Sequence, residues 1–190
     1  SGSSSPSASR SEEPPRLHRR PDPIRDPAVR RFGAGESSLR PPEGLRGLLV
    51  RFVVANPSTY LWLGPERPSE GDFAGPDSAS CPTWNDWPYG TVNRNSYARG
   101  SDEWAIRSQL TGRDVRILLG DADTLTANLD VSCPANLQGR RRFDRGLALM
   151  RFMDLYFPGH RHRDSVIPDV GHSSRDMYGS AAGRAALTSW

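Results

Sequence analysis

The stretch "VRILLGDADTLTANLD", residues 115–130, joins a short hydrophobic run to a polar loop. The run is rich in β-branched residues and leucine, and it predicts a buried strand that stops at Gly120. Two acids, Asp121 and Asp123, follow directly after this strand. Functional groups of parallel α/β sheets gather in loops beyond the carboxyl ends of the strands, so we expect this loop to belong to a functional site.

The surrounding segments predict an α/β fold in which helices flank a parallel sheet. "LLVRFVVAN", residues 48–56, predicts a strand buried on both faces, and a third strand is expected near residues 165–167. Helical patterns occupy residues 101–110, 137–157 and about 175–189, and the first of them opens with a serine cap. Strands that alternate with helices in this way pair in parallel, with the helices as crossovers.

The N-terminal part of the chain differs in composition from the rest. Residues 1–45 are rich in proline, arginine and serine and have almost no periodic hydrophobic pattern, so we expect them to be disordered or loosely attached. Residues 46–190 are expected to form the folded domain. A hydrophobic content of 35% and a mean hydropathy of −0.64 agree with a domain joined to a disordered segment.

Charge and hydrophobicity narrow the classes of partner. All 25 basic residues are arginine, and 22 acidic residues are interspersed among them. The sequence therefore predicts no large surface of positive charge, and nucleic-acid binding is not expected. The sequence has no run of about 18 apolar residues, so no membrane span is expected. The first residues also lack the hydrophobic core of a signal peptide. The compartment and the oligomeric state stay open.

Two cysteines, Cys81 and Cys133, are too few for a disulfide scaffold and lack the paired spacing of a zinc site. Two alternatives remain for them, a single disulfide or a pair of buried thiols. A disulfide requires that their Cα atoms lie within about 4.4 to 6.8 Å of each other.

An acid and a histidine follow two successive predicted strands. Asp123 comes after the strand at 115–119, and His172, in "VIPDVGHSSRDM", comes after the strand near 165–167. We therefore expect Asp123 to accept a hydrogen bond from an imidazole nitrogen of His172, while Asp121 points elsewhere. The alternative is that Asp123 caps its own turn and His172 is solvated.

Five segments resemble the C-terminal half of a family of α/β-hydrolase-fold serine hydrolases, over about residues 48–187. They are "RFVVANPSTYLWLGPERP", "CPTWNDWPYG", "RDVRILLGDADT", "LDVSCPANLQGRRRFDRG" and "IPDVGHSSRDMYGSAAG". The resemblance implies a partial α/β-hydrolase-like parallel sheet and hydrolysis of a small ester or amide through an acyl-enzyme. It also implies that Asp123, in Gly120-Asp121-Ala122-Asp123-Thr124, and His172, in Val170-Gly171-His172, are the acid and base of a Ser-Asp-His triad.

The nucleophile that this family carries upstream is not evident. The sequence contains no G-x-S-x-G elbow, and its nearest match surrounds Ser37 in "GESSL". Pro41 and Pro42 would break the helix that must follow a nucleophile. Residues 1–45 also offer no counterpart of the loop that donates an oxyanion N–H, a donor worth about 3 to 4 kcal/mol. We therefore expect this chain to keep the acid and the base but to be inactive alone.

His160, His162 and Asp164 form a second cluster that could bind a metal ion. No further ligand follows at a defined spacing, so a solvated turn is the prediction for this cluster. Neither a metal nor an organic cofactor is expected.

The loop between the first predicted strand and the first predicted helix is rich in tryptophan, proline and glycine. Its aromatic residues Trp84, Trp87 and Tyr89 could line an acyl pocket or could form a cap that packs on the sheet. The aromatic loop also supports a different class of function, a non-catalytic protein that keeps the remnant fold and uses the loop for recognition. Fluorophosphonate labelling that is lost in Ser37→Ala would exclude this alternative.

Overall fold

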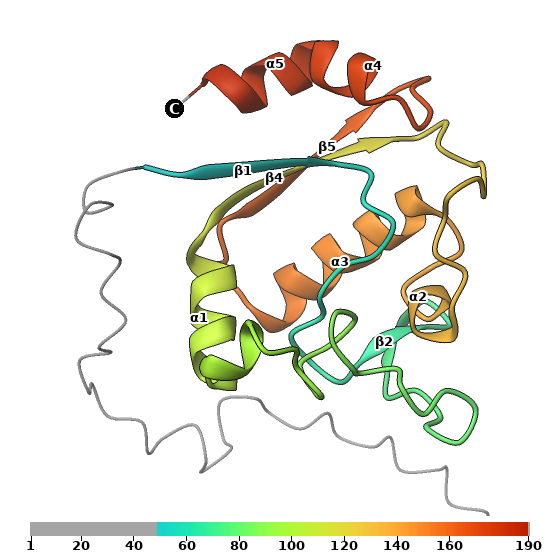
Figure 1. Ribbon diagram of the computed structural model, residues 1–190. Helices are drawn as coiled ribbons and strands as arrows, with labels where there is room; N and C mark the ends of the chain where they lie inside the picture. Colours follow the sequence, from blue (N-terminus) through green and yellow to red (C-terminus); the bar gives the residue numbers. More distant parts are fainter. Residues whose placement is uncertain (1–48, 190) are drawn as a thin grey trace, which may run out of the picture. The chain divides into compact units, whose positions relative to one another are not determined.

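The computed structural model describes residues 49–189, and a three-stranded parallel sheet lies at its centre (Figure 1). The strands are β1 (Arg51–Ala55), β4 (Asp114–Gly120) and β5 (His162–Ile167), in the order β1-β4-β5. Both neighbouring pairs are parallel, so the predicted α/β class and the pairing of the strands are confirmed. The prediction of disorder for residues 1–45, and the candidate Ser37, lie outside the described residues.

Helices cover both faces of the sheet. Helices α1 (Glu103–Gly112) and α3 (Arg142–Tyr156) lie on one face, and α4 (Ser174–Gly179) and α5 (Ala181–Thr188) lie on the other (Figure 1). The remaining elements are short and lie in the connections: β2 (Arg67–Ser69), β3 (Asp72–Ala74), the 3₁₀ turn η3 (Ala98–Gly100) and α2 (Cys133–Asn136). None of the helices between residues 49 and 189 has the length and hydrophobicity that crossing a bilayer requires.

The larger hydrophobic core lies between β4 and α3. Leu119 and Phe152 are completely buried there, and Trp62 packs against Phe152 with ring centroids 4.6 Å apart. Full burial of a side chain of this size stabilises the fold by about 1.5 to 3 kcal/mol. Gly146 allows the close approach of α3, because a Cβ there would lie 2.3 Å from a Leu119 methyl carbon. A smaller core of Leu118, Ile167 and Met177 fills the opposite face.

The aromatic loop is fixed by a buried arginine. Arg67 lies between the rings of Trp62 and Trp84, at 5.1 and 5.0 Å from their centroids, and donates hydrogen bonds to the carbonyls of Trp84 and Tyr89. Burial lowers the pKa of Arg67 to about 10, although the Glu66 carboxylate opposes this shift. These contacts are those of a packed cap, one of the two alternatives for this loop.

Two predicted boundaries were wrong because of local backbone chemistry. Helix α1 begins at Glu103, and its cap is Asp102 instead of the preceding serine, since the Asp102 carboxylate accepts from Ala105 N at 2.7 Å. The helix predicted for residues 137–157 begins only at Arg142, because Gly139 has a φ of +145°, which is incompatible with a helix.

Three further predictions needed correction. The strand expected to be buried on both faces is β1, an edge of the described sheet, and its Phe52 is 41% exposed. The terminal helix is interrupted at Ser180, whose side chain caps α5. His162 is not in a solvated turn, because it opens β5 and is buried. No cluster of three or more metal-ligating side chains occurs among residues 49–189.

The burial of His162 predicts a pH-dependent stability. Desolvation lowers the pKa of this imidazole, and a hydrogen bond to the Leu110 carbonyl, 2.9 Å from Nε2, opposes the shift only in part. The unfolded chain therefore binds the proton more tightly, so the stabilisation is complete above the unfolded pKa of about 6.5 and is lost as the pH falls below it. The urea concentration at the midpoint of unfolding is expected to decrease as the pH is lowered from 7.5 to 5.5. The decrease is expected to be less steep in His162→Gln. Equal slopes in the two proteins would contradict this assignment.

Candidate active site

Asp123 and His172 meet at the carboxyl ends of two adjacent strands. Asp123 lies in the loop after β4 and His172 in the loop after β5, and His172 Nδ1 is 2.9 Å from Asp123 Oδ2. The distance lies within the range of a hydrogen bond. Asp121 points elsewhere, as predicted, because its carboxylate accepts from the backbone N–H of Asp169 at 2.7 Å.

The loop that carries His172 packs closely against the end of β4. A Cβ at Gly120 would lie 2.2 Å from the carbonyl oxygen of Val170, so only glycine allows this approach. The backbone N–H of Asp121 donates to the Ile167 carbonyl at 3.3 Å and extends the strand pairing by one bond. The loops that follow β4 and β5 therefore lie against each other at the carboxyl ends of these strands.

Asn56 joins the end of β1 to the same site. Its side-chain Nδ2 donates to Asp123 Oδ2 at 2.7 Å, and its side-chain Oδ1 accepts from Gly120 N at 3.1 Å. The residue is buried and has a φ of +37°, a conformation that asparagine adopts more readily than most residues. The sequence pattern did not predict this contact, although Asn56 ends the first predicted strand and precedes a proline.

Arg142 provides the positive charge nearest to Asp123. Its guanidinium Nη1 lies 3.4 Å from Asp123 Oδ1, and the two side chains are 1% and 0% exposed. The same group donates to the carbonyls of Leu125 and Ala127, at 3.2 and 2.9 Å. A carboxylate removed from water requires such partners, because an unpaired buried charge is costly. No local pattern in the sequence indicates this role, since Arg142 is the last of three consecutive arginines.

The imidazole of His172 is accessible on its other side. Its side chain is 48% exposed, and no residue between 49 and 189 forms a hydrogen bond with its Nε2. When Nδ1–H donates to Asp123, the neutral ring carries its lone pair on Nε2. This nitrogen can therefore accept a proton from a group that approaches from solvent.

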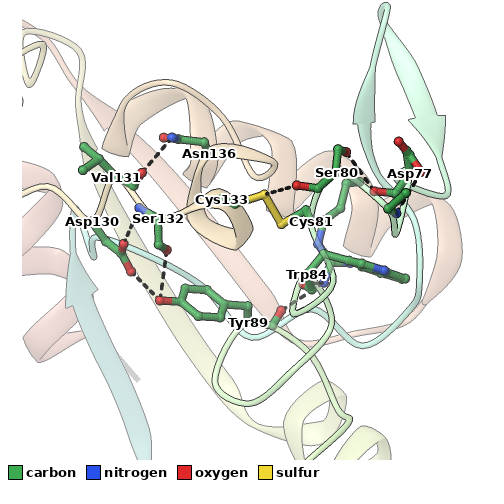
Figure 2. Close-up of a disulfide and its surroundings, with 12 residues drawn as sticks. Asp77, Ser80, Cys81, Trp84, Tyr89, Asp130, Val131, Ser132, Cys133 and Asn136 are labelled. Atoms are coloured by element: carbon green, nitrogen blue, oxygen red, sulfur yellow. Dashed lines mark hydrogen bonds between the residues drawn. A yellow bond between two sulfur atoms is a disulfide. The ribbon is translucent and has the colours of Figure 1, made fainter.

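The far end of the loop that carries Asp123 is tied down by a disulfide. Cys133, which opens α2, is bonded to Cys81, and their Cα atoms are 5.9 Å apart (Figure 2). This answers the question of bridge or free thiols that the sequence left open. Next to the bridge, Tyr89 donates its hydroxyl to Asp130 Oδ2 at 2.7 Å (Figure 2). Residues 121–132 are thus fixed at both ends.

No protein-family model matches this sequence, and no curated protein matches it. Chains of solved structures are similar to it, among them the following two. LpqC, a poly(3-hydroxybutyrate) depolymerase from Bordetella parapertussis, is 23% identical over 70% of this chain and 39% of its own length, with a TM-score of 0.48. Poly(aspartic acid) hydrolase-1 from Sphingomonas sp. KT-1 is 24% identical over 70% of this chain and 43% of its own, with a TM-score of 0.47.

Both of these structures are hydrolytic enzymes by name. This chain spans less than half the length of either one.

The close approach at Gly120 predicts that Gly120→Ala disturbs the site. The added methyl group collides with the Val170 carbonyl, so we expect the free energy of unfolding to fall by about 1 to 3 kcal/mol and the amide resonances of residues 169–173 to shift. The matched control is Gly112→Ala, whose Cβ meets nothing within 4 Å. Two variants of equal stability would contradict the packing of this loop.

Proposed function

We propose that Asp123 and His172 are the acid and the base of a site that hydrolyses ester or amide bonds. The observation that carries this proposal is the 2.9 Å contact between His172 Nδ1 and Asp123 Oδ2, in which Asp123 is buried and His172 is half exposed. A buried acid that holds one imidazole nitrogen and leaves the other accessible is the geometry that general base catalysis requires.

The proposed reaction assigns one task to each residue. His172 Nε2 takes the proton of an attacking hydroxyl as the hydroxyl oxygen bonds to the carbonyl carbon. The proton then passes to the leaving oxygen or nitrogen as its bond to that carbon breaks. Asp123 holds the ring in the tautomer that has a free Nε2, and it stabilises the imidazolium that forms.

The nucleophile is a separate part of the proposal. The sequence contains no G-x-S-x-G, and none of residues 49–189 is hydrogen-bonded to Nε2. Ser37, the nearest match to an elbow, lies outside the described residues. We therefore propose that residues 49–189 supply the acid and the base but not the nucleophile, and that hydrolysis of unactivated substrates by the chain alone is negligible.

The alternative function, recognition by the aromatic loop without catalysis, has weaker support. Trp84 stacks on the buried Arg67, and Tyr89 uses its hydroxyl on Asp130 beside the disulfide, so both side chains serve the packing of the loop. A fluorophosphonate probe separates the two functions. Labelling that disappears in Ser37→Ala would exclude the binding alternative and would place the nucleophile within this chain.

Hydrolysis of p-nitrophenyl acetate tests the acid and the base without requiring a serine, because an activated imidazole attacks this ester or activates water toward it. We expect the chain to hydrolyse the ester above background, and both His172→Gln and Asp123→Asn to lose most of that rate. General acid–base catalysis is worth roughly 10²- to 10⁴-fold, so a loss of at least about 10-fold is expected.

The matched control is His160→Gln. His160 also pairs with a carboxylate, Asp154, at 3.0 Å, but it follows α3 at the amino end of β5 and away from Asp123. Its substitution is expected to leave the rate unchanged. Equal rates for His172→Gln and the unmodified protein would reject the proposed function.

A further inference from the structure

The first turn of α3 contains two arginines that are almost completely buried. Arg142 is 1% exposed and Arg145 is 0% exposed. Removing a guanidinium from water is costly, so each must be compensated by hydrogen bonds or by an opposite charge. The two side chains are compensated by different groups. This difference distinguishes an arginine that only stabilises packing from one that also acts on the site.

Arg145 is compensated by neutral acceptors. It donates to the carbonyls of Gly139 and Ser58, at 2.7 and 2.6 Å, and to the side-chain oxygen of Asn136 at 3.2 Å. Burial lowers its pKa, and the Asp130 carboxylate opposes this shift. Its contacts therefore join α3 to α2 and to the segment after β1, and none of them reaches the Asp123 carboxylate.

Arg142 makes two similar bonds to carbonyls but also faces a charge. Its Nη2 donates to Ala127 O at 2.9 Å and its Nη1 to Leu125 O at 3.2 Å, both in the loop that follows Asp123. The same Nη1 lies 3.4 Å from Asp123 Oδ1, which makes a long ion pair. One side chain thus binds the carboxylate and the backbone of the loop that carries it.

The division of contacts between the two carboxylate oxygens restricts the orientation of Asp123. Oδ2 accepts from Asn56 at 2.7 Å and from His172 at 2.9 Å, whereas Oδ1 faces Arg142. Partial rotation of the carboxylate about its bond to Cβ would move both oxygens away from their partners and break contacts on both sides. Without Arg142, Oδ1 would stay buried with no cation beside it among the described residues.

We infer that Arg142 is a positioning residue for the Asp123–His172 pair, acting through charge on Asp123 and through the Leu125 and Ala127 carbonyls. The effect on hydrolysis rests on the proposed function, whereas the coupling between Arg142 and Asp123 does not. Arg142 does not touch the substrate. Its task is to keep Asp123 Oδ2 directed at His172.

A double-mutant cycle on stability tests the coupling without any activity. Arg142→Met leaves a buried carboxylate without its cation, so we expect the folding equilibrium constant to fall by at least about 100-fold. Adding Asp123→Asn removes the stranded charge, and it is expected to raise the constant of Arg142→Met by at least about 10-fold. In the unmodified protein the same Asp123→Asn change lowers the constant, because it weakens the bond to His172.

Arg145→Met is the matched control, since it removes an equally buried guanidinium from the same helical turn. Asp123→Asn is expected to lower the stability of Arg145→Met as it lowers that of the unmodified protein. Should Arg142→Met fail to fold, folding of the double variant Arg142→Met/Asp123→Asn would support the inference. Failure of both, or the same cycle for the two arginines, would overturn it.

The rate of p-nitrophenyl acetate hydrolysis separates positioning from packing. At a temperature where all variants are folded, Arg142→Met is expected to lose at least about 10-fold, Arg142→Lys to recover most of this loss, and Arg145→Met to keep the rate. Equal losses in Arg142→Met and Arg145→Met would reject a positioning role. Absence of any His172-dependent rate in the unmodified protein would reject the proposed function, while the stability cycle would still decide the coupling.

Discussion

The burial of the Asp123 carboxylate is the constraint on which the candidate site depends. The side chain is completely buried, so its charge must be met by donors that come from the protein itself. These donors come from three distant parts of the chain: Asn56 at the end of β1, Arg142 at the start of α3, and His172 after β5. The contacts that satisfy Asp123 also hold His172 in place.

The parallel order of the sheet makes this convergence possible. Because β4 lies between β1 and β5, the carboxyl ends of all three strands meet at one edge, and the loops of the outer strands reach the loop of the central one. Two backbone features complete the approach. Gly120 gives room to the Val170 carbonyl, and Asn56 turns the chain with a positive φ directly after β1.

Much of the framework could be predicted from local sequence. The hydrophobic run before Gly120 fixed the position of β4, and the positions of Asp123 and His172 after successive strands predicted their contact. The contributions of Asn56 and Arg142 could not be found in this way. Each acts on a residue far away in sequence, at 67 and 19 positions, and nothing in their immediate neighbours distinguishes them from a turn residue or a surface arginine.

Errors in the prediction have the same origin. Phe52 looked like a core residue because hydrophobic runs do not reveal whether a strand lies at the edge of a sheet. His162 looked solvated because only the tertiary structure places it against the Leu110 carbonyl. Cys81 and Cys133 could not be paired from spacing, since their approach depends on how the aromatic loop packs against α2.

The most direct test of the account is the tautomer and hydrogen bonding of His172, measured by NMR on protein with ¹⁵N-labelled histidine. The neutral ring is expected to carry its proton on Nδ1, and the bond to Asp123 is expected to shift the signal of this proton strongly downfield. Asp123→Asn is expected to abolish the shift. A neutral ring protonated on Nε2, or a spectrum unchanged in Asp123→Asn, would contradict the account.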